Sequence, residues 1–174
     1  MTAISKGERE FIMNQNEVGE NNMNEADKNN MYEATQCIVK KFDELEFKYE
    51  YDKCDDADTL TLRFNTDTIP LVEILLVISE DFDCTIYSPN IANVNEEKLT
   101  ETLKALNKLN ADYRYVRFYV ENNTITVKTD ILVLSDSTDI ADTYADYIVS
   151  MIDMHIGVIE EAYPKIMETI WKTN

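Results

Sequence analysis

Few side chains in this sequence could carry out chemistry. There is a single histidine, His155, and there are three cysteines, Cys37, Cys54 and Cys84, which lie 17 and 30 positions apart. A structural zinc ion takes four closely placed cysteine or histidine ligands, and this spacing does not supply them. His155 falls on the apolar side of a predicted helix and no nucleophile pattern accompanies it, so we interpret it as a packed or partly exposed helix histidine rather than a catalytic one.

The cysteines are interpreted as reduced thiols. Their odd number and the absence of a CxxC pair are typical of a reducing cytosol rather than of a disulfide framework. The first residues also lack the apolar region of a signal peptide, so we expect a cytoplasmic protein. Cys54 lies in an acidic loop, where the neighbouring charges disfavour a reactive thiolate.

An acidic stretch with Asp52, Asp56 and Asp58 is the remaining candidate for a metal site. A calcium loop of the EF-hand kind needs glycine at its sixth position and glutamate at its twelfth. No alignment of this acidic stretch with such a loop supplies both residues. We interpret this stretch as a solvated turn. The sequence also has only three glycines and no phosphate-binding glycine motif. We therefore predict a protein that is not an enzyme, with no catalytic residue, no metal and no cofactor.

Charge limits the partners of the chain. Its 174 residues include 34 Asp plus Glu against 16 Lys plus Arg, a net charge of -18 that repels nucleic-acid phosphates and anionic membranes. No apolar run approaches the roughly 20 residues of a membrane span. The excess is uneven, with five basic against fourteen acidic residues in 31–95 but six against seven in 96–136. The acidic surface is interpreted as a solvated one, although it could instead select a basic partner, and the nearly neutral segment is where a protein partner is expected to dock.

Hydrophobic periodicity predicts the elements of the first half of the chain. Residues 1–29 are asparagine-rich and acidic and are predicted to be a flexible tail, with a single domain over residues 30–174. Apolar residues at steps of three or four predict a helix over about 30–45, capped by Asn29 or Asn30. Period-two alternation then predicts antiparallel strands at 46–52, 59–64, about 70–79 and 84–87, the last ending at Ser88-Pro89-Asn90.

The second half is predicted to contain two helices and a hairpin. One helix begins at Asn95, buries Leu99, Leu103 and Leu106, and ends with Asn110 in a left-handed conformation. Strands at about 113–120 and 124–133 are joined by Asn122-Asn123, because asparagine tolerates positive φ. A long helix over about 138–163 follows the capping residues Ser135-Asp136-Ser137, and Pro164 is expected to end or kink it, with a further turn to Trp171.

The predicted order is helix, three or four antiparallel strands, helix, two-strand hairpin and long C-terminal helix. This order indicates an α+β fold in which the helices cover one face of the sheet. On the hairpin, Val116, Phe118 and Val120 face one side, and the other side carries the residues predicted to bind a partner, which are Tyr113, Tyr115, Arg117 and Tyr119. Tyrosine combines apolar area with a polar tip, which suits interfaces, although the same rings could instead cover the sheet beneath a helix.

One combination of motifs resembles a known family. The helix with Leu99, Leu103 and Leu106 ends in Leu-Asn-x-Leu-Asn at Asn110, an aromatic-rich hairpin follows from Tyr113 to Leu134, and the last helix carries Asp153 and Pro164. Over residues 30–172 this arrangement is similar to the YbjN-type family, bacterial proteins described as sensory transduction regulators. The resemblance implies a fold like that of type III secretion chaperones, with no catalytic residues to transfer.

Two functions remain open on these grounds. The leading hypothesis is a non-enzymatic protein-interaction module, chaperone-like or regulatory, that forms a homodimer and binds another protein or a peptide segment. The alternative is an acidic mimic of nucleic acid that occupies a basic site on a DNA-binding protein, which would require carboxylates at phosphate-like spacing.

Overall fold

The computed structural model describes residues 30–54, 56–132 and 140–172, without the side chains of 140–142. The predicted tail over residues 1–29 and the predicted caps at Ser135-Asp136-Ser137 lie outside the described residues.

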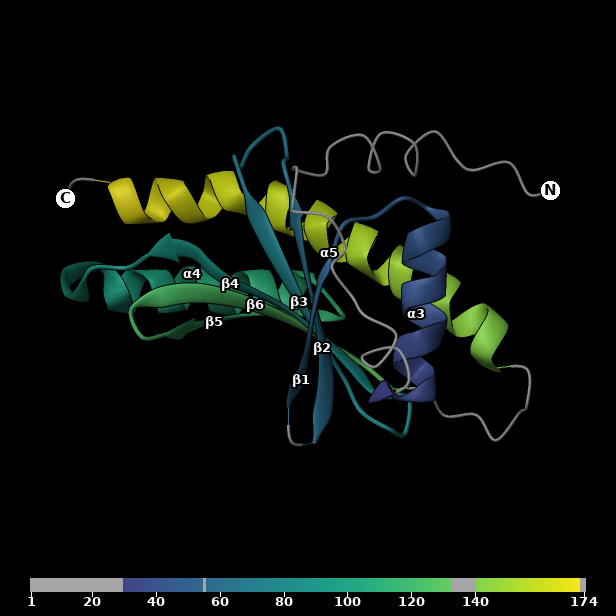
Figure 1. The fold of residues 1–174 in the computed structure, drawn as a ribbon. Helices are drawn as coiled ribbons and strands as arrows, with labels where there is room; N and C mark the ends of the chain where they lie inside the picture. Colours follow the sequence, from purple (N-terminus) through teal and green to yellow (C-terminus); the bar gives the residue numbers. More distant parts are fainter. Residues whose placement is uncertain (1–29, 55, 133–139, 173–174) are drawn as a thin grey trace.

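The described residues form an α+β fold in the predicted order (Figure 1). The elements are α3 (Glu33–Glu44), β1 (Glu50–Cys54), β2 (Ala57–Phe64), β3 (Val72–Ile78), β4 (Cys84–Asn93), a single 3-10 turn η1 (Glu96–Lys98), α4 (Leu99–Asp112), β5 (Val116–Glu121), β6 (Thr124–Ile131) and α5 (Ile140–Trp171).

The strands form a six-stranded antiparallel sheet in the order β1-β2-β3-β4-β6-β5. The first four strands are a meander in which each pairs with its neighbour in sequence, as predicted. The chain then leaves the sheet through α4 and returns so that β6 pairs with β4 and β5 becomes an edge strand. The long helix α5 contacts both α3 and α4, and one face of the sheet is buried beneath these helices.

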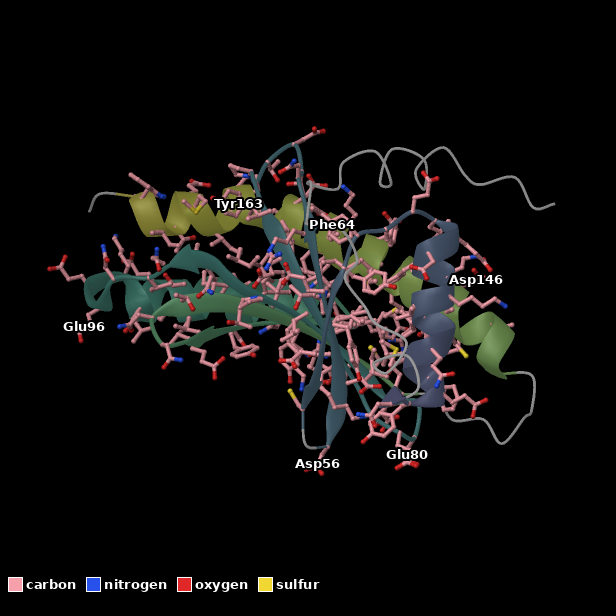
Figure 2. All side chains as sticks on the ribbon, viewed as in Figure 1. Asp56, Phe64, Glu80, Glu96, Asp146 and Tyr163 are labelled. Carbon is pink, nitrogen blue, oxygen red and sulfur yellow. The ribbon has the colours of Figure 1, made fainter. Side chains whose placement is uncertain are left out.

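The core lies between the helices and this buried face. Alternate residues of β2 and β3 point into it, among them Leu60, Leu76 and Phe64, which are almost fully buried. Each such side chain stabilises the fold by about 2 kcal/mol through loss of water contact. Figure 2 shows the opposite behaviour of the labelled acidic residues, which point away from the core at the periphery: Asp56, Glu80, Glu96 and Asp146.

The start of α3 differs from the prediction. Its N-cap residue is Tyr32, not Asn29 or Asn30, and the Tyr32 side chain makes no capping hydrogen bond. The backbone N–H of Tyr32 instead donates to the carboxylate of Asp58 on β2, at 2.7 Å. The cap therefore comes from a residue 26 positions away, which local sequence patterns cannot reveal.

The fourth strand is also longer than predicted. Ser88-Pro89-Asn90 does not end β4 but forms an irregularity in its pairing with β6, after which the strand continues to Asn93. A bulge tolerates both the missing N–H of Pro89 and the positive φ of Asn90, which is 57°. The turn residues Ser88-Pro89-Asn90 therefore mark an irregularity within β4 and not its end.

Two predictions about α4 are wrong. Leu103 is 47% exposed, and the buried positions are Thr102, Leu106 and Leu109. Asn110 does not adopt positive φ, because the helix continues to Asp112. Its side chain instead holds β5 in place, accepting from the N–H of Phe118 at 2.7 Å and donating to its carbonyl at 2.9 Å.

The hairpin turn is confirmed, and the effect of Pro164 is not. Asn122 and Asn123 both have positive φ, 50° and 62°, as a tight primed turn requires. Pro164 lies inside α5, which continues to Trp171 without a second helix. Buried residues on both sides of the proline, Ala162 and Ile166, keep the helix packed on the sheet, and this packing outweighs the lost hydrogen bond.

Candidate functional site

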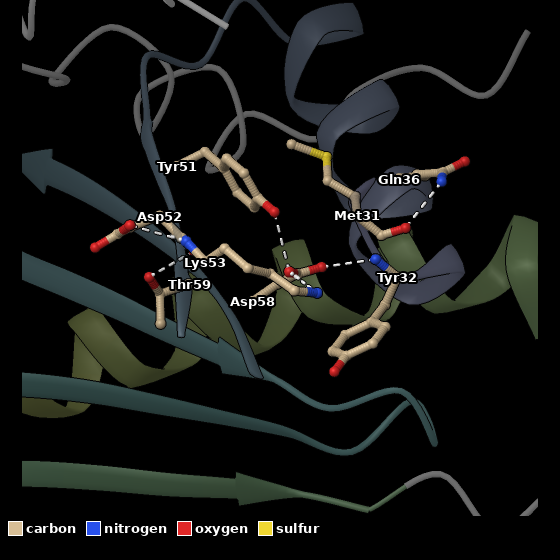
Figure 3. Close-up of polar contacts among 8 residues, drawn as sticks. All are labelled: Met31, Tyr32, Gln36, Tyr51, Asp52, Lys53, Asp58 and Thr59. Atoms are coloured by element: carbon tan, nitrogen blue, oxygen red, sulfur yellow. Dashed lines mark hydrogen bonds and ion pairs between the residues drawn. The ribbon is translucent and has the colours of Figure 1, made fainter. Parts of the chain in front are cut away.

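The first candidate centre surrounds Asp58, whose side chain is fully buried (Figure 3). Its Oδ2 accepts from the Tyr32 N–H, and its Oδ1 accepts from the Tyr51 hydroxyl at 3.1 Å and from Lys53 Nζ at 2.8 Å. The same ammonium group lies 3.5 Å from the centroid of the Tyr32 ring, which adds a cation–π contact. Asp58 thus ties the β1–β2 hairpin to the start of α3.

This geometry overturns the interpretation of Asp58 as part of a solvated turn. Burial by itself raises the pKa of a carboxyl group, but the hydrogen bonds from Lys53, Tyr32 and Tyr51 outweigh it and hold the pKa of Asp58 below its ordinary value. The carboxylate is ionised and fully engaged within the protein. Within the ranges that the structure describes, no three acidic, cysteine or histidine side chains gather as metal ligands.

The second candidate centre is His155 on α5, which is fully buried. Its Nδ1 lies 2.8 Å from Thr129 Oγ1 and its Nε2 lies 3.1 Å from Ser88 Oγ. A neutral imidazole has one donor and one acceptor nitrogen, so one hydroxyl accepts from the ring and the other donates to it. Burial lowers the pKa of His155 to about 3. The interpretation as a packed histidine is confirmed, because the ring joins α5 to β4 and β6 and has no access to solvent.

The cysteines do not provide a reactive thiol in the core. Cys84 on β4 is buried, and burial raises the pKa of its thiol to about 12, so that it stays protonated. Cys54 is exposed at the end of β1, and Cys37 is half-buried on α3.

The residues predicted from the sequence to form one partner-binding set lie in different places in the structure. Tyr113 follows α4 and is half-buried, with its ring centroid 6.1 Å from that of the core residue Phe118. It therefore does not share the exposed side of the hairpin, because β5 begins only at Val116. Tyr115 also precedes β5 and is 59% exposed, with the Arg114 guanidinium 5.9 Å from its ring centroid.

Only Arg117 and Tyr119 lie on β5 with the predicted orientation, on the face of the sheet opposite the buried one. Register places Arg117 directly across from Lys128 on β6, and Lys128 directly across from Tyr87 on β4. Lys128 Nζ lies 5.4 Å from the centroid of the Tyr87 ring. We call these four side chains the tyrosine face: Tyr87, Arg117, Tyr119 and Lys128. The period-two pattern could have added Tyr87 and Lys128 to the predicted set. That these two residues lie opposite one another, however, follows only from the strand order, in which β6 pairs with β4.

The face that carries these residues has a small net charge. The register places on it three basic side chains, Arg63, Arg117 and Lys128, and five acidic ones, Glu50, Asp52, Glu73, Glu121 and Asp130. Most of them are paired. Arg63 contacts the carboxylates of β1 and β3 at 2.8 and 3.1 Å, and Lys128 contacts Asp130 at 2.9 Å. In the part of the chain that the structure describes, the helices lie on the other face.

A groove lies elsewhere, between the last part of β4 and the C-terminal turns of α5. It encloses about 590 Å³. Its apolar lining comes from Ile91 and Ala92 on one side and from Met167, Ile170 and Trp171 on the other. Trp171, the single tryptophan of the chain, is 75% exposed. Sequence analysis did not identify this groove.

Comparison with known proteins identifies the family. The family model YbjN, "Putative bacterial sensory transduction regulator", matches residues 38–165, well over half of the chain. The chain belongs to the YbjN family. A solved structure described as "YbjN, a putative transcription regulator from E. coli" is similar, with a TM-score of 0.48 and 16% sequence identity, over 75% of this chain and 92% of that one. A search of curated proteins found no match.

The YbjN-family chain can thus be described as a regulator-family protein whose buried polar groups serve the fold. Asp58 and His155 are saturated with protein partners and have no opening to a substrate. Among the described residues, no helix is long and apolar enough to cross a membrane. In the described parts of the chain, the tyrosine face and the groove beside α5 are candidate binding surfaces.

Proposed function

We propose that this protein is a cytoplasmic, non-enzymatic regulator that acts by binding another protein, and that the tyrosine face is its contact surface. The single observation that supports this most is electrostatic. On a chain with a net charge of -18, the face around Tyr119 carries three basic against five acidic side chains, a small surplus. A protein can approach there with little repulsion, and Tyr87 and Tyr119 offer apolar area with polar tips.

A second copy of the chain meets the same condition, so we propose a homodimer through this face. Two acidic copies would repel one another wherever their surplus carboxylates face each other. Six strands about 4.8 Å apart and about seven residues long form a face about 24 by 23 Å. This area of about 550 Å² is about two thirds of the roughly 800 Å² per partner of a standard interface, so a weak, concentration-dependent dimer is expected.

Light scattering over a range of concentrations tests the dimer. Tyr119→Asp adds a charge in the middle of the proposed interface and is expected to give a monomer. Tyr147→Asp is the matched control, because Tyr147 is 48% exposed on α5, which packs on the other face of the sheet. A wild-type monomer at every concentration, or equal dissociation by both variants, would rule out this interface.

Photocrosslinking in cells tests for a different protein partner. A photoreactive phenylalanine at position 119 is expected to give a specific crosslinked product that the same group at position 147 does not give. If the wild type is a monomer and position 119 crosslinks to nothing, the proposed function fails. A partner that is released at about 1 M salt, where the Debye length is about 3 Å, would instead indicate the acidic nucleic-acid mimic.

A further inference from the structure

The last part of β4 has a strand on only one side. β3 pairs with β4 from Cys84 to Tyr87, whereas β6 pairs with it as far as Asn93. Beyond Tyr87, β3 and β4 diverge, and the C-terminal part of α5 runs beside the part of β4 that is left (Figure 1). In the described ranges, the side of β4 away from β6 therefore has no strand partner over residues 88–93.

Backbone groups on this side of β4 are directed toward the groove. The N–H of Val94 donates to the carbonyl of Asn123 at 2.8 Å, which is the β6 side of the strand. Backbone groups in an antiparallel strand alternate in direction, so the N–H and C=O of Asn93 point to the opposite side. Ile91 lies within the irregular pairing between Ser88 and Ala92, so the regular alternation covers only Ala92 and Asn93. Both residues line the groove.

The other wall of the groove is apolar. Met167, Ile170 and Trp171 come from successive turns of α5 and face the open edge of β4 across about 590 Å³. Trp171 is 75% exposed. An exposed tryptophan next to an unpaired strand edge combines an apolar anchor with directional hydrogen-bonding groups, the two elements by which sheet edges bind peptides.

The charge of the lining indicates an uncharged occupant. Only Glu97, Lys98 and Lys172 among the lining residues are charged, and Lys98 already contacts Glu101 at 3.0 Å. The remaining polar lining consists of asparagine side chains. The groove therefore selects neither the strongly basic partner that the total charge of -18 would attract nor a strongly acidic one.

We propose that this groove binds an extended, uncharged peptide segment of a partner protein, which pairs with the outward N–H and C=O of Asn93 at the end of β4 and places apolar side chains against Met167, Ile170 and Trp171. The bulge at Ser88-Pro89-Asn90 limits this backbone pairing to the end of the strand. This inference rests on the proposed function, since it assumes a protein partner, but it concerns a surface separate from the tyrosine face.

Selection from a phage-displayed library of linear seven-residue peptides tests the groove with the full chain as target. Peptides that bind the wild type but not Trp171→Ala are expected to have apolar residues at alternate positions and few charges. Enrichment of helical spacing, with apolar residues three and four apart, would overturn the proposal. So would the absence of any peptide that depends on Trp171.

Backbone methylation of a selected peptide tests strand addition directly. An N-methyl group removes one N–H donor and blocks the approach of the edge, so each bonded position is expected to lose about tenfold in affinity. The loss is expected at the one peptide residue that pairs with Asn93, because the neighbouring N–H groups point away from β4. Uniform effects along the peptide would show that it does not bind as a strand. Binding is followed by the fluorescence of Trp171, the single tryptophan.

A matched pair of variants tests the same contact from the protein side. Asn93→Pro removes the outward N–H of β4, whereas Asn93→Ala keeps it and removes only the side chain. We expect Asn93→Pro to lose about tenfold in affinity and Asn93→Ala to remain within about twofold of the wild type. Equal affinities of the two variants would overturn the proposal. Circular dichroism shows whether Asn93→Pro folds. If it does not fold, the affinities of the methylated peptides for the wild type still test the proposal.

These results can be separated from the test of the proposed function. Tyr119→Asp alters the tyrosine face and leaves the groove intact, so it is expected to bind the selected peptides like the wild type. If position 119 crosslinks to a partner while the groove selects no peptide, the inference about the groove fails alone.

Discussion

The stability of the folded protein is expected to fall between pH 7.5 and pH 5 because of one residue, His155. The chain has no other histidine, so few other side chains titrate in this range. In the folded state the ring lies between two neutral hydroxyls, and burial lowers the pKa of His155 to about 3 from an ordinary value of 6.5. The unfolded chain therefore takes up a proton over a range in which the folded chain does not.

The size of this effect follows from proton linkage. A group whose pKa is lowered on folding, and which is neutral in the folded protein, stabilises the fold above the unfolded pKa and loses that contribution as pH falls. With pKa values of 6.5 and about 3, the free energy of unfolding is expected to drop by about 1.4 kcal/mol from pH 7.5 to 5.5. At pH 5 the drop reaches about 2 kcal/mol.

Urea unfolding at pH 7.5, 6.5, 5.5 and 5.0 measures the effect, with His155→Gln as the control. Glutamine has an amide donor and acceptor for Ser88 and Thr129 but does not titrate. The variant is expected to be less stable at pH 7.5 and nearly independent of pH over this range. Equal pH dependence of the two proteins would refute the reasoning, as would an NMR titration of the folded protein that gives His155 an ordinary pKa.

Three further substitutions have distinct expected outcomes. Asp58→Asn removes the charge that holds Tyr32 N–H and the β1 lysine, and is expected to cost about 2–3 kcal/mol in urea unfolding at pH 7. Because the pKa of Asp58 is lowered, its contribution is present above the ordinary carboxyl pKa and lost as pH falls through the folded value, so the stabilities of the two proteins should converge in strong acid. Asn110→Ala removes two hydrogen bonds to Phe118 and is expected to cost about 1–3 kcal/mol, with faster hydrogen exchange of the Phe118 amide; unchanged exchange would contradict this. Pro164→Ala restores a helical N–H and is expected to stabilise α5 by about 1–2 kcal/mol in thermal unfolding, and a lower melting temperature would count against it.

The parts of the fold that depend on local preferences could be predicted from the sequence. Positive φ at Asn122 and Asn123 is a property of asparagine itself, and the hairpin formed where it was expected. The alternation of Leu60, Leu62 and Phe64 likewise indicated a strand with one buried side. His155 was correctly assigned to the core because its neighbours on the helix are apolar.

The errors concern features that depend on distant parts of the chain. Asp58 resembled a solvated turn residue because its main partner at Tyr32 is 26 positions away. Leu103 matched the apolar spacing of α4 but lies on a side that no described element covers. The binding set was divided because β5 begins at Val116, after Tyr113 and Tyr115. The groove was missed because it depends on where β3 separates from β4.

The strand order has a consequence for how this chain reaches its native state. The pairings of β1 with β2, β2 with β3 and β3 with β4 all join neighbours in sequence, so that part of the sheet can close through short loops with a small entropic cost. In contrast, α3 can make its contact with α5 only after α5 has been synthesised, and α5 begins roughly 100 positions after α3 ends. We therefore expect the meander to form early and the α3–α5 contact to be completed last. During synthesis on the ribosome, the part of α3 that packs on α5 would stay uncovered until almost the whole chain has emerged.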